Sequence, residues 1–192
     1  MKNENEYGLI GKNISLKALE EKDLDKIFAW KNNYELANLI KTHPLPVARY
    51  EIEEWLKRNQ SDKNQILWGI YDLKSDELLG IARLMFIDWI SSNAEFGIFI
   101  GSKSGRGKGL GKETTKMVLN FAFNDANLHK VYLKVTESNA KAIGLYESCG
   151  FDKEGLLKHH FWNNGKYENI VMMGMLKNEP PRPKGRGIMQ RK

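Results

Sequence analysis

The feature that most constrains the fold is a strand that runs into a glycine-rich loop, which in turn opens a helix. Residues 94–100, AEFGIFI, have the composition of a strand, and residues 105–113, GRGKGLGKE, contain four glycines and three cations. From Leu110 onward, apolar or small side chains recur on one helical stripe for about three turns. A loop so rich in glycine is entropically costly to order, so we expect a ligand to dock against its backbone.

A glycine loop at the start of a helix favours phosphate, because its backbone N–H groups lie at the positive end of the helix dipole. Two common phosphate motifs do not fit the spacing, however. A P-loop would need glycine at position 106 and serine or threonine at 113, where the chain has Arg106 and Glu113. A dinucleotide-binding G-x-G-x-x-G would need glycine at a position held by Leu110 or Lys112. The sequence therefore argues against both nucleotide-binding loops.

The rest of the chain predicts one α/β domain built on a mixed sheet. A length of 192 residues with 41% hydrophobic content suits a single core. We expect an N-terminal extension over residues 1–13, a domain over 14–178 and a basic flexible tail over 179–192. Periodicity and turn signals predict strands at 14–19, 66–73, 78–90, 94–100 and 130–135 with two more around 163–166, and helices at 22–33, 34–40, 49–59, 110–122 and 139–150.

Composition excludes several classes of protein. No apolar run is long enough to span a membrane and no secretory signal is visible, so we expect a cytoplasmic protein. The single cysteine, Cys149, excludes an internal disulfide, and the four histidines lack metal-ligand spacing, so we expect no metal. The formal net charge is +6, but the tail over 179–192 carries five Lys/Arg and one Glu, so little of the charge belongs to the fold.

Two motifs together resemble the GNAT-type N-acetyltransferases. Residues 106–111, RGKGLG, fit the pattern [Gln/Arg]-x-x-Gly-x-[Gly/Ala], and residues 137–151, ESNAKAIGLYESCGF, match the helix that follows it in that family. The resemblance covers roughly residues 14–176 and implies the GNAT fold, a mostly antiparallel sheet flanked by helices. The ending over 161–176, FWNNGKYENIVMMGML, is similar to the branch that acetylates ribosomal-protein N-termini, spermidine and nucleotide-linked amino sugars.

This resemblance implies acetyl-coenzyme A as the cosubstrate and a primary amine as the acceptor. In the family the glycine turn carries the pyrophosphate on successive backbone amides, and the strand before it faces the pantetheine arm. Such a strand must splay from its neighbour at 130–135, for which Gly97 is the only hint. The residues expected to bind the cosubstrate are Ile98, Phe99, Ile100, Arg106, Gly107, Lys108, Gly109, Leu110, Gly111, Lys112 and Asn139.

Acetyl transfer to an amine requires a base for the amine and an acid for the departing thiolate, since a primary amine has a pKa near 10. Glu95 is the candidate base, acting through an ordered water, and Tyr146 the candidate acid. Each has a structural alternative: a salt bridge at the strand end for Glu95 and an amphipathic core position for Tyr146. For Asn139 the structural alternative is helix capping, for which Ser138 is at least as good, and we favour contact with the cosubstrate.

The acceptor and the assembly state stay open at this point. The first two helices, the HPLP loop and the last hairpin should line the acceptor pocket, although each candidate side chain is more often a packing or surface residue. Alternatives to an enzyme are a nucleic-acid-binding protein that uses RPKGRG in the tail, and a coenzyme A binder without catalysis. A membrane partner is not expected, nucleic acid is disfavoured, and a homodimer stays open. The candidate lining residues are Trp30, Glu35, His43, Trp55, Trp89 and Trp162.

Overall fold

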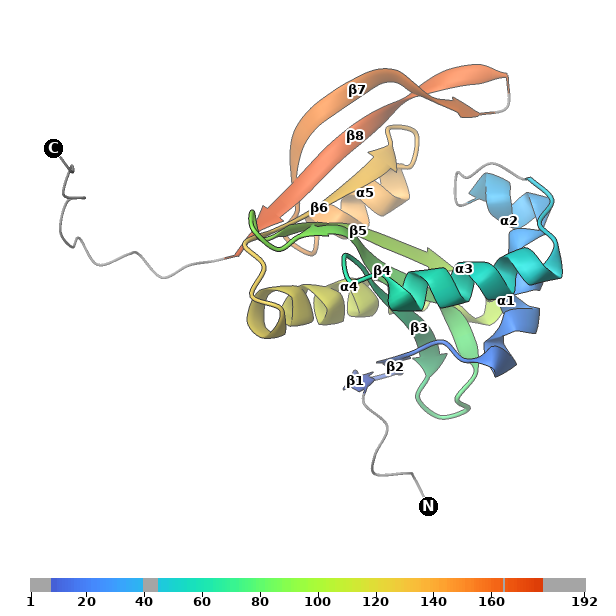
Figure 1. The fold of residues 1–192 in the computed structure, drawn as a ribbon. Coiled ribbons are helices and arrows are strands. Elements are labelled where there is room, and N and C mark those ends of the chain that lie inside the picture. The colour runs from blue at the N-terminus through green and yellow to red at the C-terminus, as the bar shows by residue number, and fades with distance from the viewer. Residues whose placement is uncertain (1–7, 40–44, 164, 178–192) are drawn as a thin grey trace, which may run out of the picture.

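The protein is built on one mixed sheet with helices on both faces, as the sequence predicts (Figure 1). The computed structural model describes residues 8–39, 45–163 and 165–177. Eight strands lie in the order β1-β2-β3-β4-β5-β6-β8-β7, and all neighbours are antiparallel except β5 and β6. The strands are β1 (Gly8–Ile10), β2 (Ile14–Lys17), β3 (Ile66–Asp72), β4 (Leu78–Asp88), β5 (Asn93–Ile100), β6 (Lys130–Thr136), β7 (Asp152–Asn163) and β8 (Lys166–Leu176).

Strand β1 is a feature that the sequence analysis did not predict. It lies within the expected N-terminal extension and pairs antiparallel with β2, from Gly8 opposite Lys17 to Ile10 opposite Ser15. A strand of three residues contains too little alternation to be recognised by pattern. The boundaries proposed at residues 13 and 178 stay predictions.

The helices divide between the two faces of the sheet. Those before β3 cover one face, and those after β5 cover the other. The predicted helix at 22–33 starts with a 3-10 turn, in which the Asp23 amide donates to the Glu20 carbonyl at 3.0 Å and the Glu20 amide donates to the Asp23 carboxylate at 2.8 Å. The helices are α1 (Leu24–Lys31), α2 (Tyr34–Leu39), α3 (Arg49–Ser61), α4 (Leu110–Asn120) and α5 (Ala140–Glu147), with 3-10 turns η1 (Glu21–Asp23) and η2 (Lys103–Gly105) and a π turn η3 (Phe121–Asp125).

Two hydrophobic cores hold these layers together. The larger core joins the sheet to α4 and α5, where Leu110, Val118 and Ile143 meet the strands. The smaller core joins the opposite face to α1 and α3 through Ile27 and Ile52. Side chains of a strand alternate between faces, so neighbouring residues of β5 face different cores.

The sheet opens between its two central strands. Strands β5 and β6 pair only from Asn93 opposite Lys130 to Glu95 opposite Tyr132. Beyond that point β5 continues beside β4 as far as Ile100, while β6 continues beside β8. The predicted splay is therefore confirmed, and it leaves one edge of the second half of β5 without a strand partner.

A buried hydrogen bond between β3 and η1 anchors the first helices to the sheet. The Tyr71 hydroxyl, in a side chain only 1% exposed, donates to the Asp23 carboxylate at 2.5 Å. We expect Tyr71→Phe to lower the free energy of unfolding by about 1.5–3 kcal/mol, because it removes a donor from a buried carboxylate. Urea denaturation at pH 7 measures this effect, and Tyr50→Phe, at an exposed tyrosine, is the control.

The same hydrogen bond should make stability depend on alkaline pH. Burial, followed by the Asp23 hydrogen bond, raises the pKa of Tyr71 above its ordinary value. A pKa raised in the folded state stabilises the protein below the ordinary tyrosine pKa of about 10 and loses that contribution as the pH rises above it. The difference between wild type and Tyr71→Phe should therefore shrink above about pH 10. A difference that grows with pH would contradict this assignment.

Candidate active site

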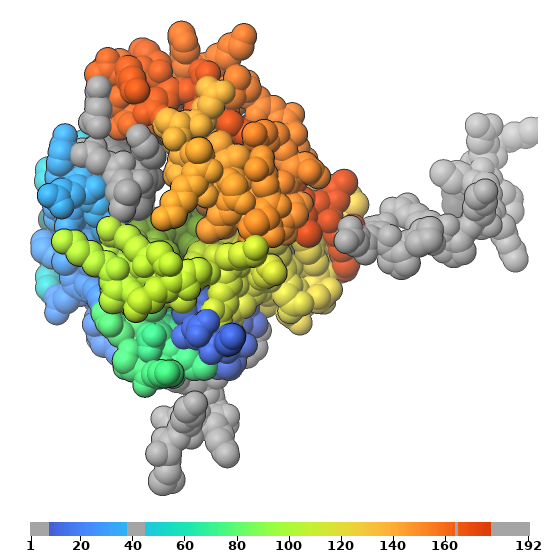
Figure 2. All heavy atoms as spheres, turned by 180° about the vertical axis from the view of Figure 1, so that it is seen from behind, coloured from blue at the N-terminus to red at the C-terminus, as the bar shows by residue number. Residues whose placement is uncertain are grey.

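The glycine loop presents a row of free backbone N–H groups. Among the residues that the structure describes, none accepts a hydrogen bond from the amides of Gly107, Lys108, Gly109, Leu110 or Gly111. These five amides end at the first turn of α4, where the helix dipole adds positive potential. Figure 2 shows this loop and the start of α4 as yellow-green atoms at the surface, next to the light-orange segment that includes α5. The arrangement is suited to an anionic ligand.

The shape of this loop depends on two glycines with left-handed backbone. Gly107 has a φ of 75° and Gly109 a φ of 78°, values that other residues rarely adopt. A Cβ added at either position would meet no atom within 4 Å, so both glycines border open space. Gly111 differs, because an added Cβ would lie 3.0 Å from Leu145 on α5. The loop is thus both exposed and closely apposed to α5.

Two ends of the predicted phosphate motif are used internally. The Arg106 amide donates to the Lys103 carbonyl at 3.3 Å, and its guanidinium Nη2 donates to the Gly101 carbonyl at 2.9 Å. The Lys112 amide donates to the Gly109 carbonyl at 3.0 Å. The row of free amides therefore begins at Gly107 instead of Arg106, and Arg106 holds the end of β5 in place.

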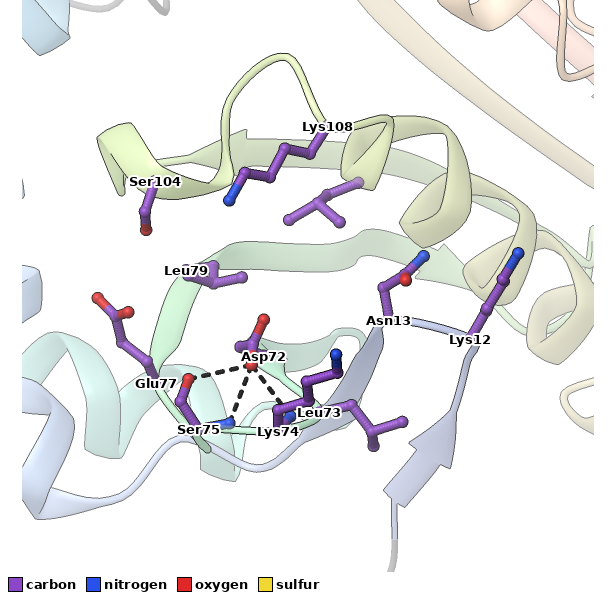
Figure 3. Close-up of a pocket in the computed structure, with 11 residues that line it drawn as sticks. Lys12, Asn13, Asp72, Leu73, Lys74, Ser75, Glu77, Leu79, Ser104 and Lys108 are labelled. Atoms are coloured by element: carbon purple, nitrogen blue, oxygen red, sulfur yellow. Dashed lines mark hydrogen bonds between the residues drawn. The ribbon is translucent and has the colours of Figure 1, made fainter.

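Lys108 lines a cavity beside the glycine loop. Its side chain extends toward this cavity of about 370 Å³, where Asp72 caps the β3–β4 turn (Figure 3). Hydrogen bonds from Ser75 and Lys74 hold the pKa of Asp72 below its usual range, and Lys108 lowers it further. This cavity is lined by Lys12, Asn13, Asp72, Leu73, Lys74, Ser75, Glu77, Leu79, Ser104, Lys108 and Leu110. Neither Glu95 nor Tyr146 lines it.

The two candidate catalytic residues lie on opposite faces of β5, at the point where β5 and β6 separate. Glu95 is the last residue of β5 that pairs with β6, opposite Tyr132. On the other face, Tyr146 packs edge-on against Phe96, with ring centroids 6.4 Å apart, and against Phe151 at 5.9 Å. The opening between the strands thus has a carboxylate on one side and a phenol on the other.

Glu95 forms the salt bridge that was its structural alternative. Its Oε2 lies 2.7 Å from the Lys134 Nζ, and its side chain is 12% exposed. Tyr132 lies beside it, and burial, followed by the negative charge of Glu95, raises the pKa of Tyr132. A charge-assisted hydrogen bond fixes the carboxylate without blocking its second oxygen.

Tyr146 has a free hydroxyl. No described residue forms a hydrogen bond with it, and its ring is held by the two aromatic contacts instead. Burial, with a smaller effect from Cys149, raises the pKa of Tyr146 to about 12. The phenol therefore stays protonated through the physiological range and is available as a donor.

Asn139 takes the capping role that was its alternative. Its Oδ1 accepts a hydrogen bond from the Ala142 amide at 3.1 Å and so begins α5. Ser138 does not cap, because its hydroxyl donates to Glu168 on β8. The Asn139 side-chain NH₂ has no partner among the described residues, and a contact from it to the cosubstrate stays a prediction.

The candidate acceptor residues are not all near the opening. Trp30 packs against Phe99 at 5.3 Å, and Trp55 lies under the Lys31 ammonium at 5.6 Å, both on the face that carries Glu95. Trp89 donates to the Lys63 carbonyl at the end of the sheet where β5 and β6 are still paired.

Two of the remaining acceptor candidates are exposed, and the third is not among the described residues. Trp162 packs edge-on against Tyr167 in the β7–β8 hairpin, and Glu35 is exposed on α2. His43 lies outside the described residues.

Three charged or polar residues of this face were missed by the sequence analysis, namely Arg83, Tyr132 and Lys134. They come next to Glu95 through the register of β4, β5 and β6. Their alternation with buried residues was visible in the sequence. The register that aligns the three strands depends on how they pair, and the sequence of a single strand does not specify it.

Neither a metal cluster nor a membrane span is found in the part of the chain that the structure describes. No group of three histidine, cysteine, aspartate or glutamate side chains there could hold an ion. None of the helices in that part is long and apolar enough to cross a bilayer.

Comparisons with known proteins give a consistent result. The family model described as acetyltransferase (GNAT) domain matches residues 13–152. The spermidine N(1)-acetyltransferase of Vibrio cholerae is 33% identical over 166 residues, which cover 86% of this chain and 94% of that relative. The structure of spermidine N-acetyltransferase from Vibrio cholerae in complex with CoA and spermine has a TM-score of 0.80 at 33% identity, covering 86% of this chain and 96% of the other. A dodecameric structure of the Vibrio cholerae enzyme has a TM-score of 0.73 at 32% identity, covering 86% and 94%.

Proposed function

Because the chain belongs to the GNAT acetyltransferase family, we propose that it transfers acetyl from acetyl-coenzyme A to a primary amine within one ternary complex. The observation that carries this proposal is the row of free amides at 107–111 beside the opening between β5 and β6. The first feature suits a diphosphate, and the second gives an extended thioester arm a place between two strands.

The residues present fit the cosubstrate. The amides of Gly107 to Gly111 would hold its diphosphate, and the unpaired edge of β5 over Phe96 to Ile100 would bind the amides of its pantetheine arm. A backbone N–H on that edge would stabilise the carbonyl oxygen as charge develops. The bound cosubstrate supplies an acetyl thioester at the opening.

Glu95 and Tyr146 are the proposed proton carriers. Glu95 would accept the proton of the acceptor amine through a water, while Lys134 keeps the carboxylate in place. Tyr146, on the opposite face, would donate its proton to the leaving thiolate, since its raised pKa keeps it protonated. Both roles are proposed because Glu95 and Tyr146 lie where β5 and β6 separate.

The acceptor is an amine, and its class is a further part of the proposal. The Vibrio relatives are named for spermidine, and one of their structures holds spermine, which supports a polyamine. An amino sugar or a protein N-terminus stays within the same branch. The dodecameric relative supports self-association of this chain, and a cytoplasmic location stays an expectation.

Release of coenzyme A thiol with an amine panel tests the proposed function. The purified chain should release thiol in the presence of an acceptor, and mass spectrometry should find one acetyl group on that amine. Initial rates at varied concentrations of both substrates should give intersecting double-reciprocal lines. Thiol release without acetylated product, or parallel lines, would contradict direct transfer.

The tail hypothesis needs a separate measurement, because residues 178–192 lie outside the described part of the chain. Deleting residues 179–192 should leave salt-dependent retention of DNA or RNA unchanged if the tail binds no nucleic acid. Lost retention would favour the nucleic-acid alternative as an additional activity.

A further inference from the structure

Arg83 occupies the centre of the face that carries Glu95. It lies on β4 directly opposite Gly97 of β5, and Met85 lies opposite Glu95 in the same register. Because side chains alternate along a strand, Arg83, Glu95 and Gly97 point to the same side of the sheet. Arg83 is therefore a neighbour of the separation point, one strand away from the opening.

The Arg83 side chain crosses over Gly97 toward that opening. A Cβ built on Gly97 would lie 3.2 Å from the Arg83 Nε and 3.4 Å from its Cγ. A larger residue at position 97 would crowd the guanidinium, so the missing side chain of Gly97 gives Arg83 its path across β5. The guanidinium thus lies over β5 on the face that carries Glu95.

Arg83 is a half-buried cation. No described residue accepts a hydrogen bond from its guanidinium or forms an ion pair with it. The carboxylate that interacts with it, Glu95, is already held by Lys134 at 2.7 Å. Burial lowers the pKa of Arg83, which reflects a charge that the protein itself does not fully compensate.

A second cation on the same side increases the positive charge. Burial, followed by the charge of Arg83, lowers the pKa of Lys31 at the end of α1. The two cations are therefore close enough to repel each other. Arg83 thus lies within electrostatic range of both Lys31 and Glu95, and Glu95 already pairs with Lys134. A polycationic acceptor would meet net repulsion here, whereas an anion would relieve it.

We propose that Arg83 is a specificity residue that binds a carboxylate or phosphate group carried by the acceptor amine. The inference rests on the proposed function, because it takes the Glu95 face as the acceptor side. A guanidinium offers two parallel N–H donors that match either anion. Residues 95 and 97 are about 7 Å apart along a strand, so the anionic group should lie a few bonds from the reacting amine. This inference departs from the polyamine that the names of the Vibrio relatives support, because it requires an acceptor amine that carries an anionic group.

Binding of matched amines in the presence of coenzyme A tests this assignment, because it requires no turnover. Calorimetry would compare glucosamine 6-phosphate with glucosamine, β-alanine with its amide, and spermidine. The wild-type chain should bind the anionic member of at least one pair about 10- to 100-fold more tightly. The two pairs distinguish phosphate from carboxylate.

Arg83→Gln should abolish this preference while leaving the affinities for the neutral amine and for coenzyme A unchanged. Arg83→Lys keeps the positive charge but loses the two parallel N–H donors of the guanidinium, so it should retain only part of the preference. Arg58→Gln, at an exposed arginine of α3, is the matched control and should behave as wild type. Unchanged coenzyme A binding also shows that each variant is folded.

Several results would overturn the assignment: no preference for the anion in either pair, a preference that survives Arg83→Gln, tightest binding of spermidine, or weaker coenzyme A binding in Arg83→Gln. Different results would contradict the proposed function. Arg83-dependent anion binding without thiol release would support this inference and contradict acetyl transfer. Acetylation of spermidine that does not depend on Arg83 would support acetyl transfer and contradict this inference.

Discussion

Replacing Gly109 with valine should weaken acetyl-coenzyme A binding by at least about 100-fold, or about 2.8 kcal/mol. Gly109 has a φ of 78°, which is strained for a β-branched residue by at least about 1–2 kcal/mol. The added side chain would also occupy open space beside the loop whose amides at 107–111 are the proposed diphosphate donors. Calorimetry with the purified variant measures the dissociation constant.

Gly165→Val is the matched control for Gly109→Val. Gly165 has a φ of 81° and equally open surroundings, but it lies between β7 and β8, away from the loop. This variant should lose a similar amount of stability and keep wild-type affinity for acetyl-coenzyme A. If Gly109→Val bound as tightly as wild type, the diphosphate would have to lie elsewhere.

Removing the Tyr146 hydroxyl should lower kcat by about 100-fold or more, the range expected for loss of a general acid. Because the ring is held by Phe96 and Phe151 and the hydroxyl has no described partner, Tyr146→Phe should change the free energy of unfolding by less than about 0.5 kcal/mol. Affinity for acetyl-coenzyme A should also stay within about twofold, because the row of free amides at 107–111 is unchanged. Single-turnover kinetics with a saturating acceptor would measure the rate of transfer directly.

The pH profile adds a second readout for Tyr146. An acid works only while protonated, and the pKa of Tyr146 is raised to about 12, so its ionisation should not reduce the rate until the pH approaches that value. Tyr132→Phe is the control on the Glu95 face, where burial also raises the phenol pKa. A large loss of kcat in Tyr132→Phe combined with wild-type activity in Tyr146→Phe would contradict this assignment and place the acid on the Glu95 face.

The local features of the site could be predicted from sequence because each is encoded in consecutive residues. The strand at 94–100, the glycine loop and the helix from Leu110 all appear where periodicity and glycine spacing placed them. The predicted splay also appears, although Gly97 was only an indirect signal. Its more specific role, making room for the Arg83 side chain, required the β4–β5 register.

The features that could not be predicted depend on which strands lie side by side. A shift of one residue in the β4–β5 register would turn Arg83 to the opposite face, and β4 contains an irregularity between Met85 and Asp88 that no pattern announces. The Glu95–Lys134 ion pair likewise joins residues from two strands separated by a helix. Arg106 and Lys108 show a related difficulty. Their positions in the motif were clear, but the directions of their side chains follow from carbonyls and cavities contributed by other segments.

The separation of β5 from β6 also bears on the order of events in a catalytic cycle. Glu95 and Tyr146 lie on opposite faces of β5 beside that gap, so under the proposed function the cosubstrate and the amine would approach it from different faces of the sheet. Neither would have to vacate the protein before the other enters, and the two products can depart independently. A mixture of both substrates should therefore reach steady state by a random sequence of association, with neither obliged to come first.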